Sequence, residues 1–367
     1  MYLSEQLHQL ALSLLPGVGN YLIRQLISHC GSAEAVFQEK RGKLLKIPGV
    51  GPQVAKEITG KKVFSDAEKE LLLIGKSGAK IIFYTSESYP ERLKGIADAP
   101  ALLYFKGNIN LNSKKILSIV GTRNATPYGK KIIEKLIEEL TIYPDLIVVS
   151  GLAYGIDISA HKASLLQNIP TLGVMASGID IIYPSLHKET VQKMINNGGI
   201  ITEYRLGTKP DAPRFPARNR IIAGLCDAIV VVEAAEKGGA LITAEIGNSY
   251  NKEIFAVPGQ IGDIYSEGCH KLIRDHKANI YTNFRDIEYL MGWSQNVIQE
   301  KIIIKDYSFL EKEGQQIVEE LKNKEGIHLD DLSWKTKLPL TKLATLLLNL
   351  EFEGIVKSLP GKKYKLL

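Results

Sequence analysis

The 367-residue sequence predicts an α/β fold with a Rossmann-like, doubly wound and mostly parallel sheet. A helical domain is expected before the sheet and a winged helix after it. Three observations predict this order. Val- and Ile-rich runs alternate with amphipathic helical patterns from about 113 to 290, a turn motif occurs twice in the first 60 residues, and three helical patterns precede two short terminal strands. The expected domains are 1–62, 63–291 and 308–367.

The composition is that of a folded soluble protein, with 45% hydrophobic and 23% charged residues. The 46 basic and 40 acidic residues leave a net charge of +6, which permits a nucleic-acid partner without demanding one. The three cysteines are too few and too far apart for a disulfide framework or a zinc site. No apolar run nears the ~18 residues that cross a bilayer, and the start does not resemble a signal peptide. We therefore expect a cytoplasmic protein with no membrane association and no metal.

The N-terminal helical domain is predicted from a near-repeat. The segment LLPGVG at 14–19 recurs as KIPGVG at 46–51, and each copy lies between helical patterns. Pro-Gly-Val-Gly between two helices makes a tight turn whose free amides point at the start of the next helix. Such a turn is either a structural cap or a phosphate-binding nest like the helix-hairpin-helix element of sequence-independent DNA binders. The residues leave both interpretations open.

The sheet is predicted from its apolar runs. After a helix at 64–77, two strands at 81–86 and 101–107 form an extension that leads into the main sheet. The central runs are 116–121, 146–151, 171–176, 200–204, 228–234, 253–259 and 278–283, and the helical segments between them include 129–141, 157–168, 186–197, 218–225 and 240–250. Nearly continuous Val/Ile runs indicate parallel strands that are covered on both faces. Ligands of such sheets bind at the carboxyl ends of the strands.

The C-terminal domain is predicted from helical patterns at 309–322, 329–336 and 340–353, after a polar linker with a short apolar run at 292–307. Two short strands around a Pro-Gly turn follow, as in a winged helix. The last 14 residues carry four lysines and no acid: Lys357, Lys362, Lys363 and Lys365. This domain could contact DNA, or it could be a small packing or partner-binding module.

The turn after the first central strand does not have a nucleotide-binding pattern. In GTRNATPYGKK, Gly121 and Gly129 are eight positions apart, which fits neither G-x-G-x-x-G nor Walker A, so no nucleotide cofactor is expected. Arg123 beside Gly121, followed by a helix start, instead suits a phosphodiester. Asp157 and His161 are spaced i, i+4, but without a third ligand the pair indicates a hydrogen bond that fixes the loop.

The densest basic stretch lies between residues 205 and 220. Its five cations, Arg205, Lys209, Arg214, Arg218 and Arg220, face one acid, Asp211, which gives a local charge of +4. Three prolines are expected to hold the loop extended, with Phe215 between arginines, and Arg218, Asn219 and Arg220 are expected to open a helix. Guanidinium groups with an interleaved aromatic ring suit single-stranded nucleic acid. The alternative is a rigid surface loop with solvated arginines and a buried Phe215.

Several strand ends carry residues that allow an anion to approach the backbone. Lys237, Gly238 and Gly239 follow the strand that ends near Glu233 and lead into a helix. Together with 121–123, 150–151 and 176–178, they would form a row of amides on one edge of the sheet. Such a row suits a polymer backbone better than a single small molecule.

These motifs carry a resemblance. SGLAYGIDISAHKA, the YP pair at 183–184, FPARNRIIAGL, GGALITAEIG and FAVPG occur in the order seen in the DNA-processing protein A family (DprA/Smf), and GTR and GCHKLI are also similar to that family. The resemblance covers almost the whole chain. It implies a dimeric, non-enzymatic protein that binds and protects single-stranded DNA without sequence specificity and helps to load the RecA recombinase during natural transformation.

The resemblance also implies site residues. Arg123, Arg218, Asn219 and Arg220 would contact DNA phosphates, together with Gly121, Gly151 and the Lys237-Gly238-Gly239 turn, and Phe215 would stack on a base or support the loop. The chain departs from the family at three positions. The family often has a basic residue at or near the positions of Tyr154 and Ser185. It also often has Ser-Gly-Ser where this chain has the Gly-Gly-Ala turn that ends at Ala240. Affinity is therefore expected to depend more on 205–220.

Two other functions remain open. One is a Rossmann-type enzyme that cleaves the glycosidic bond of a nucleoside monophosphate through Glu233 or Asp157. The other is a small-molecule sensor whose winged helix reads duplex DNA, against which the acids Glu311, Glu313, Glu319 and Glu320 count.

Overall fold

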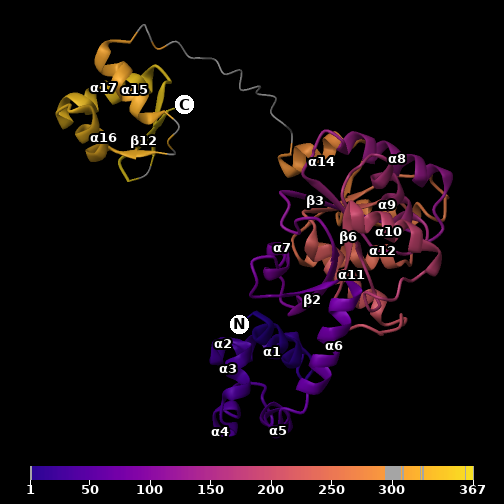
Figure 1. Cartoon of the computed structure of the whole chain (residues 1–367). Helices are drawn as coiled ribbons and strands as arrows, with labels where there is room; N and C mark the ends of the chain where they lie inside the picture. Colours follow the sequence, from indigo (N-terminus) through magenta and orange to yellow (C-terminus); the bar gives the residue numbers. More distant parts are fainter. Residues whose placement is uncertain are drawn as a thin grey trace. The chain divides into compact units, whose positions relative to one another are not determined.

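The computed structural model describes residues 2–293, 307, 310–322, 324, 326–359 and 361–366. It divides into two compact units, residues 1–294 and 295–367, each described here by itself (Figure 1). Most of the linker predicted at 292–307 falls outside the described residues.

The larger unit is built on a sheet of nine strands in the described residues, in the order β1-β2-β6-β5-β4-β3-β7-β8-β9. The strands are β1 (Lys80–Phe83), β2 (Leu102–Gly107), β3 (Lys115–Val120), β4 (Leu146–Ser150), β5 (Thr171–Val174), β6 (Gly198–Thr202), β7 (Ala228–Val231), β8 (Glu253–Ala256) and β9 (Asn279–Ile280). From β6 to β9 along the sheet all neighbours are parallel. The two strands of the predicted extension add to the β6 edge in antiparallel fashion. The doubly wound, mostly parallel sheet is confirmed.

Helices cover both faces of this sheet. One face packs against α7 (Glu91–Lys94), α11 (Arg214–Leu225), α12 (Gly239–Ser249) and α13 (Glu267–Arg274). The other packs against α8 (Pro127–Leu140), α9 (Ile156–Leu166), α10 (Lys188–Asn196) and α14 (Phe284–Met291), with a 3-10 turn, η1 (Ser185–His187), before α10. Successive strand residues alternate between the two cores, as Ile116 and Leu117 do. This explains why the strands are apolar at nearly every position.

The first 60 residues form a tandem of helical hairpins. The helices are α1 (Tyr2–Leu14), α2 (Asn20–Cys30), α3 (Ala33–Gln38), α4 (Arg41–Leu44) and α5 (Pro52–Gly60), followed by α6 (Phe64–Ser77). In the two turns Gly17 and Gly49 have φ of +75° and +85°, and a Cβ at either glycine would touch Val54 or Leu22, which belong to the other copy. The repeat in the sequence is therefore a reciprocal packing of two turns.

These helices share one hydrophobic cluster with β2, β6 and α10, which includes Leu26, Ile58, Tyr104 and Met194. The boundary placed between residues 62 and 63 therefore stays a prediction, because the helical part and the sheet pack into a common core.

The smaller unit contains α15 (Lys312–Leu321), β10 (Ile327–His328), α16 (Leu329–Thr336), α17 (Leu340–Phe352), β11 (Val356–Leu359) and β12 (Lys363–Leu366). Its strands lie in the order β10-β12-β11 and pack with the helices around Ile317, Leu332, Leu347 and Val356. The predicted winged helix is confirmed, with β10 as an added short strand. In the described part of the chain, no helix is both long and apolar enough to cross a bilayer.

Candidate nucleic-acid interface

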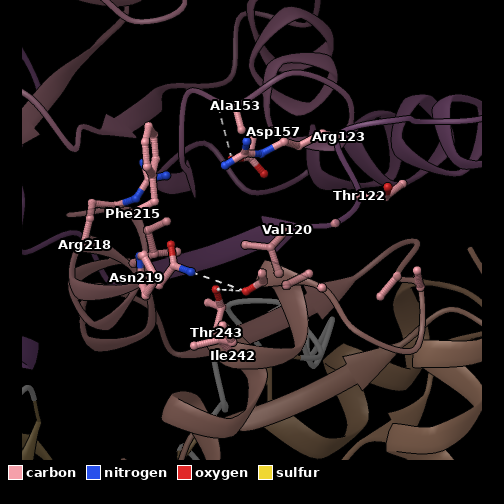
Figure 2. A pocket seen from close by; sticks show the side chains of 18 of the residues that line it. Val120, Thr122, Arg123, Ala153, Asp157, Phe215, Arg218, Asn219, Ile242 and Thr243 are labelled. Carbon is pink, nitrogen blue, oxygen red and sulfur yellow. Dashed lines mark hydrogen bonds between the residues drawn. The ribbon is translucent and has the colours of Figure 1, made fainter. Parts of the chain in front are cut away.

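A groove of the first unit lies where the strand order reverses. The chain runs from β3 through β4 and β5 to β6 on one side and then crosses to β7 on the other side of β3. Loops that leave neighbouring strands in opposite directions create a crevice at their carboxyl ends. There a groove of about 770 Å³ is lined by 120–124 after β3, by Ala153 and Asp157 after β4, and by residues of α11 and α12 (Figure 2).

The floor of the groove holds two buried side chains of opposite charge, Arg218 and Asp157. Arg218 is 4% exposed, donates to the Val174 carbonyl and lies beside Asp157, and burial raises the pKa of Asp157 to about 6 although Arg218 opposes the shift. A Cβ on Gly151 would lie 2.6 Å from a terminal nitrogen of Arg218, so this position accepts only glycine. Gly151 and Arg218, both predicted as phosphate contacts, therefore form the support beneath the groove.

One wall combines a cation with two rings. The Arg123 guanidinium lies 5.3 Å from the centre of the Phe215 ring, and the Tyr183 ring lies 5.9 Å from Phe215 on a tilted axis. Arg123 is exposed and has no ion pair among the described residues. The structure thus brings Arg123 and Phe215 together, although 92 residues separate them in the sequence.

The opposite part of the groove is the start of α12. Gly238 is the N-cap residue without a side-chain cap, and Lys237 before it is exposed. A Cβ on Gly239 would meet nothing within 4 Å, so the backbone there is open to the groove. The Asn219 side-chain amide donates to the Gly239 carbonyl at 3.3 Å, and Thr243 donates to the same oxygen. The amides of this helix start remain directed toward the groove.

The turn after β3 is held by Glu233. Its carboxylate accepts hydrogen bonds from the Thr126 amide, at 3.0 Å, and from the Thr126 hydroxyl, while the Glu233 carbonyl accepts from the Thr122 amide at 2.7 Å. A Cβ on Gly121 would lie 2.9 Å from that carbonyl. Gly121 is therefore required by packing, and the Glu233 carboxylate is occupied in ordering the start of α8.

The row of free amides expected along the sheet edge is shorter than predicted. The Thr122 amide is bonded to Glu233, and the Gly178 amide donates to the Thr208 carbonyl at 2.8 Å. Both amides serve the protein's own loops, which leaves the 237–240 turn as the part of that row open to a ligand.

The predicted start of the helix at Arg218 is wrong. Helix α11 begins at Arg214, and Pro213 precedes it as the N-cap residue. Pro216 is accommodated because it lies in the first turn, where backbone amides have no partner within the helix. Arg218, Asn219 and Arg220 consequently lie in the second turn, away from the positive end of the helix.

Arg220 lies outside the groove. Its guanidinium is bonded to the Glu203 carboxylate and lies 3.9 Å from Asp98, with the side chain 15% exposed. Two other cations of the stretch also lie near acids: Arg214 lies 3.9 Å from Asp211, and Arg205 lies 4.0 Å from the buried Glu70. Three acids outside the stretch, Glu70, Asp98 and Glu203, therefore balance part of the +4 charge counted from the sequence.

Two carboxylates fix the loop that leads into α11. Glu70 of α6 accepts from the Leu206 amide at 2.8 Å, and Asp180 accepts from the Gly207 amide at 3.0 Å. Neither acid was identified from the sequence, since 136 residues separate Glu70 from Leu206. The position of the loop depends on α6, the helix that follows the helical hairpins.

A small hollow adjoins the groove and is lined by aromatic side chains that were not predicted as site residues. Tyr154 and Tyr183 line it together with Phe215, and Tyr154 contacts the His187 ring edge-on at 5.2 Å. On the other side of the groove, Asn124 donates to the Tyr265 hydroxyl at 2.9 Å. The YP pair at 183–184 was the one sequence signal that pointed to Tyr183.

His161 is buried behind the floor and is neutral. Its Nε2 donates to the Gly151 carbonyl at 2.6 Å and its Nδ1 accepts from the Thr171 hydroxyl, while burial lowers the pKa of His161 to about 4. The expected Asp157–His161 bond is replaced by these two contacts. His161 therefore orders the carbonyl of Gly151, directly beneath the Asp157–Arg218 pair.

We expect His161 to make the first unit less stable as the pH falls from about 6.5 toward 4. Asp157, whose pKa is raised to about 6, acts in the opposite direction over the same range, so the His161 contribution is read from the difference between the wild type and His161→Gln. The unfolded chain binds a proton at His161 near pH 6.5 and the folded chain does so only near 4, so acid favours unfolding, by about 2 kcal/mol between pH 6.5 and 5. Urea denaturation of the wild type and of His161→Gln at both pH values measures this difference. A wild-type pH dependence equal to that of His161→Gln would contradict the assignment.

The fold defines a class: a doubly wound α/β protein with a groove at the switch point of its sheet, preceded in the chain by a helix-hairpin-helix tandem and followed by a winged helix. The model of the family described as DNA recombination-mediator protein A matches residues 80–292. The DprA winged helix domain matches 308–362, and a SAM-like helix-hairpin-helix tandem matches 10–59. The chain belongs to the DNA-processing protein A (DprA/Smf) family.

Relatives and solved structures agree with this family. The DNA processing protein DprA of Streptococcus pneumoniae is 41% identical over 201 residues, which cover 55% of this chain and 70% of that protein. The X-ray structure of DprA from S. pneumoniae matches with 35% identity and a TM-score of 0.66, over 76% of this chain and 95% of that one. DNA processing protein A from Helicobacter pylori, described by its single-stranded DNA binding mode, matches with 28% identity and a TM-score of 0.53, over 59% of this chain and 96% of that one.

Proposed function

We propose that this protein binds single-stranded DNA in the groove at the carboxyl ends of β3 and β7, without sequence specificity. The observation that carries the proposal is the combination of unpaired cations, open helix amides and exposed rings in one groove of a protein of this family. Arg123 and Lys237 are the exposed cations that line the groove, and neither has an acid within ion-pair distance among the described residues, whereas Arg218 is buried near Asp157.

Each wall has its own role in this proposal. Arg123, Lys237 and the amides at Gly238 and Gly239 bind phosphates, since a guanidinium, an ammonium and a helix N-terminus all favour anions. Phe215, Tyr183 and Tyr154 offer π-faces on which bases can stack irrespective of sequence. Asn219 and Arg218 position the walls, and Arg220 stabilises α11 through Glu203 and Asp98. In this view Tyr154, where relatives often have a cation, contributes stacking in place of charge.

The Arg123→Ala/Lys237→Ala variant tests the groove. It is expected to lose about tenfold or more in affinity for oligo-dT, and the slope of log K against log salt should fall by about 1.4, because each phosphate contact on a single strand contributes about 0.7. Fluorescence anisotropy over a salt series measures both quantities.

A matched control is Lys135→Ala/Arg285→Ala, which removes the same charge from the outer surface of α8 and α14. Equal salt slopes for the two variants would refute the groove. So would measurable cleavage of a nucleoside monophosphate by the wild type, which is the activity expected of the alternative enzyme.

We further propose that the protein protects the bound strand and hands it to the RecA recombinase during transformation, acting as a homodimer in the cytoplasm. The support is the family's description as a recombination mediator. RecA ATPase activity on single-stranded DNA coated with single-strand-binding protein should rise when this protein is added, and sedimentation should give twice the monomer mass. If RecA ATPase activity does not rise, the proposed mediator role is wrong, but the proposal that the protein binds DNA is unaffected.

A further inference from the structure

The β11–β12 hairpin of the winged helix places lysines opposite one another. In the antiparallel register Lys357 is the direct partner of Lys365, and Lys363 lies two residues along β12 on the same face. Direct cross-strand partners have Cβ atoms about 5 Å apart, and like charges at such positions are destabilising. Lys362 stands in the turn before β12, with φ of +55°.

These four lysines have no acid within ion-pair distance in the described part of the chain. Three other lysines of the same unit lie near an acid: Lys322 lies 3.4 Å from Glu319, Lys335 lies 3.5 Å from Glu320, and Lys342 lies 2.6 Å from Glu313. Lys312, Lys324 and Lys337 are single unmatched lysines among the described residues, whereas the hairpin gathers four unmatched lysines in one short segment.

The charge of this unit is divided between its two sides. The helices carry Glu313, Glu319 and Glu320 on α15 and Asp330 and Asp331 in the first turn of α16. The one lysine of α17, Lys342, is already paired with Glu313. An anionic polymer is repelled by the acids of α15 and α16 and finds its densest positive charge on the hairpin, which Glu351 of α17 contacts through Ser358.

We propose that the hairpin Val356–Leu366 is a second nucleic-acid contact, which binds the phosphate backbone through Lys357, Lys363 and Lys365 and reads no sequence. A row of phosphates relieves the repulsion between Lys357 and Lys365 and releases counterions. Because groove and hairpin belong to one chain, a strand long enough to reach both gains affinity through effective concentration. The hairpin site goes beyond the function proposed for the groove.

The test uses the full chain and the triple variant Lys357→Gln/Lys363→Gln/Lys365→Gln. Oligo-dT of about 60 nucleotides and duplex of about 60 base pairs probe the two forms of backbone, and oligo-dT of about 12 nucleotides fills the groove alone. For the long probes we expect about a tenfold loss of affinity and a salt slope lower by about 2 on single strands. Affinity for the short probe should not change.

The matched control is Lys322→Gln/Lys335→Gln/Lys342→Gln, which removes the same charge from the same unit where each lysine already has an acid. Equal long-probe affinities for the two triple variants would overturn the proposal, and so would a loss confined to a protein partner with no change on DNA. A loss on only one long probe identifies which form of backbone the hairpin binds. The melting temperature of the hairpin variant should equal or exceed that of the wild type, since like charges are removed, and a lower value would contradict the repulsion argument.

The short probe distinguishes a failure of the groove proposal from a failure of the hairpin proposal. If Arg123→Ala/Lys237→Ala leaves short-probe binding intact, the groove assignment falls, while the hairpin is still judged by the long probes alone.

Discussion

Replacement of Arg218 by methionine is expected to lower the free energy of unfolding of the first unit by about 3–5 kcal/mol, the typical cost of leaving a buried charge uncompensated. The guanidinium is buried, donates to the Val174 carbonyl and lies beside Asp157, whose side chain is also buried. Methionine fills similar space but leaves the carboxylate and the carbonyl without their partner. Urea denaturation at pH 7 measures the change.

The double variant Asp157→Asn/Arg218→Met separates charge from packing. It removes the uncompensated carboxylate and keeps an acceptor for the Ala153 amide, so it is expected to recover much of the lost stability. If Arg218→Met instead keeps wild-type stability and loses affinity for oligo-dT, the guanidinium faces the ligand and the floor assignment is wrong.

Gly239→Glu is expected to reduce affinity for oligo-dT by more than about thirtyfold while the protein stays folded. The new side chain meets no protein atom within 4 Å at its Cβ, and an acid in the first turn of α12 favours the helix. The same carboxylate would occupy the place where phosphates meet the amides and Lys237. Anisotropy with oligo-dT, together with a thermal melt, separates the loss of binding from any loss of folding.

The control for this variant is Gly75→Glu, which adds the same charge at an exposed position of α6 where a Cβ is also free of contacts. It should bind as the wild type does. Gly239→Ala should bind nearly as well as the wild type and melt slightly higher, because alanine favours the helix over glycine. An affinity loss in Gly75→Glu equal to that in Gly239→Glu would mean that net charge alone governs binding.

The comparison of Arg123 with Arg220 shows how far sequence reasoning reached within the site. Both were predicted as phosphate contacts from neighbouring motif residues. Arg123 lies in the groove because its turn follows β3 at the switch point of the sheet, which the alternation of strands and helices already indicated. Arg220 lies outside it because α11 begins four residues earlier than predicted, and because Glu203 and Asp98 reach its guanidinium.

The sequence by itself determined the helical, sheet and winged-helix parts and the edge of the sheet at which the groove lies, because hydrophobic periodicity and Pro-Gly turns act over a few residues. Only the tertiary structure decided which cations stay free. In the basic stretch at 205–220, Arg205 is matched by Glu70 and Arg220 by Asp98 and Glu203, and two of these three acids lie far from the stretch in the sequence. The hairpin lysines at 357–365 meet no such acids in the described residues. Charge can be counted along a chain, but whether a charge is compensated depends on contacts between distant residues, which folding alone creates.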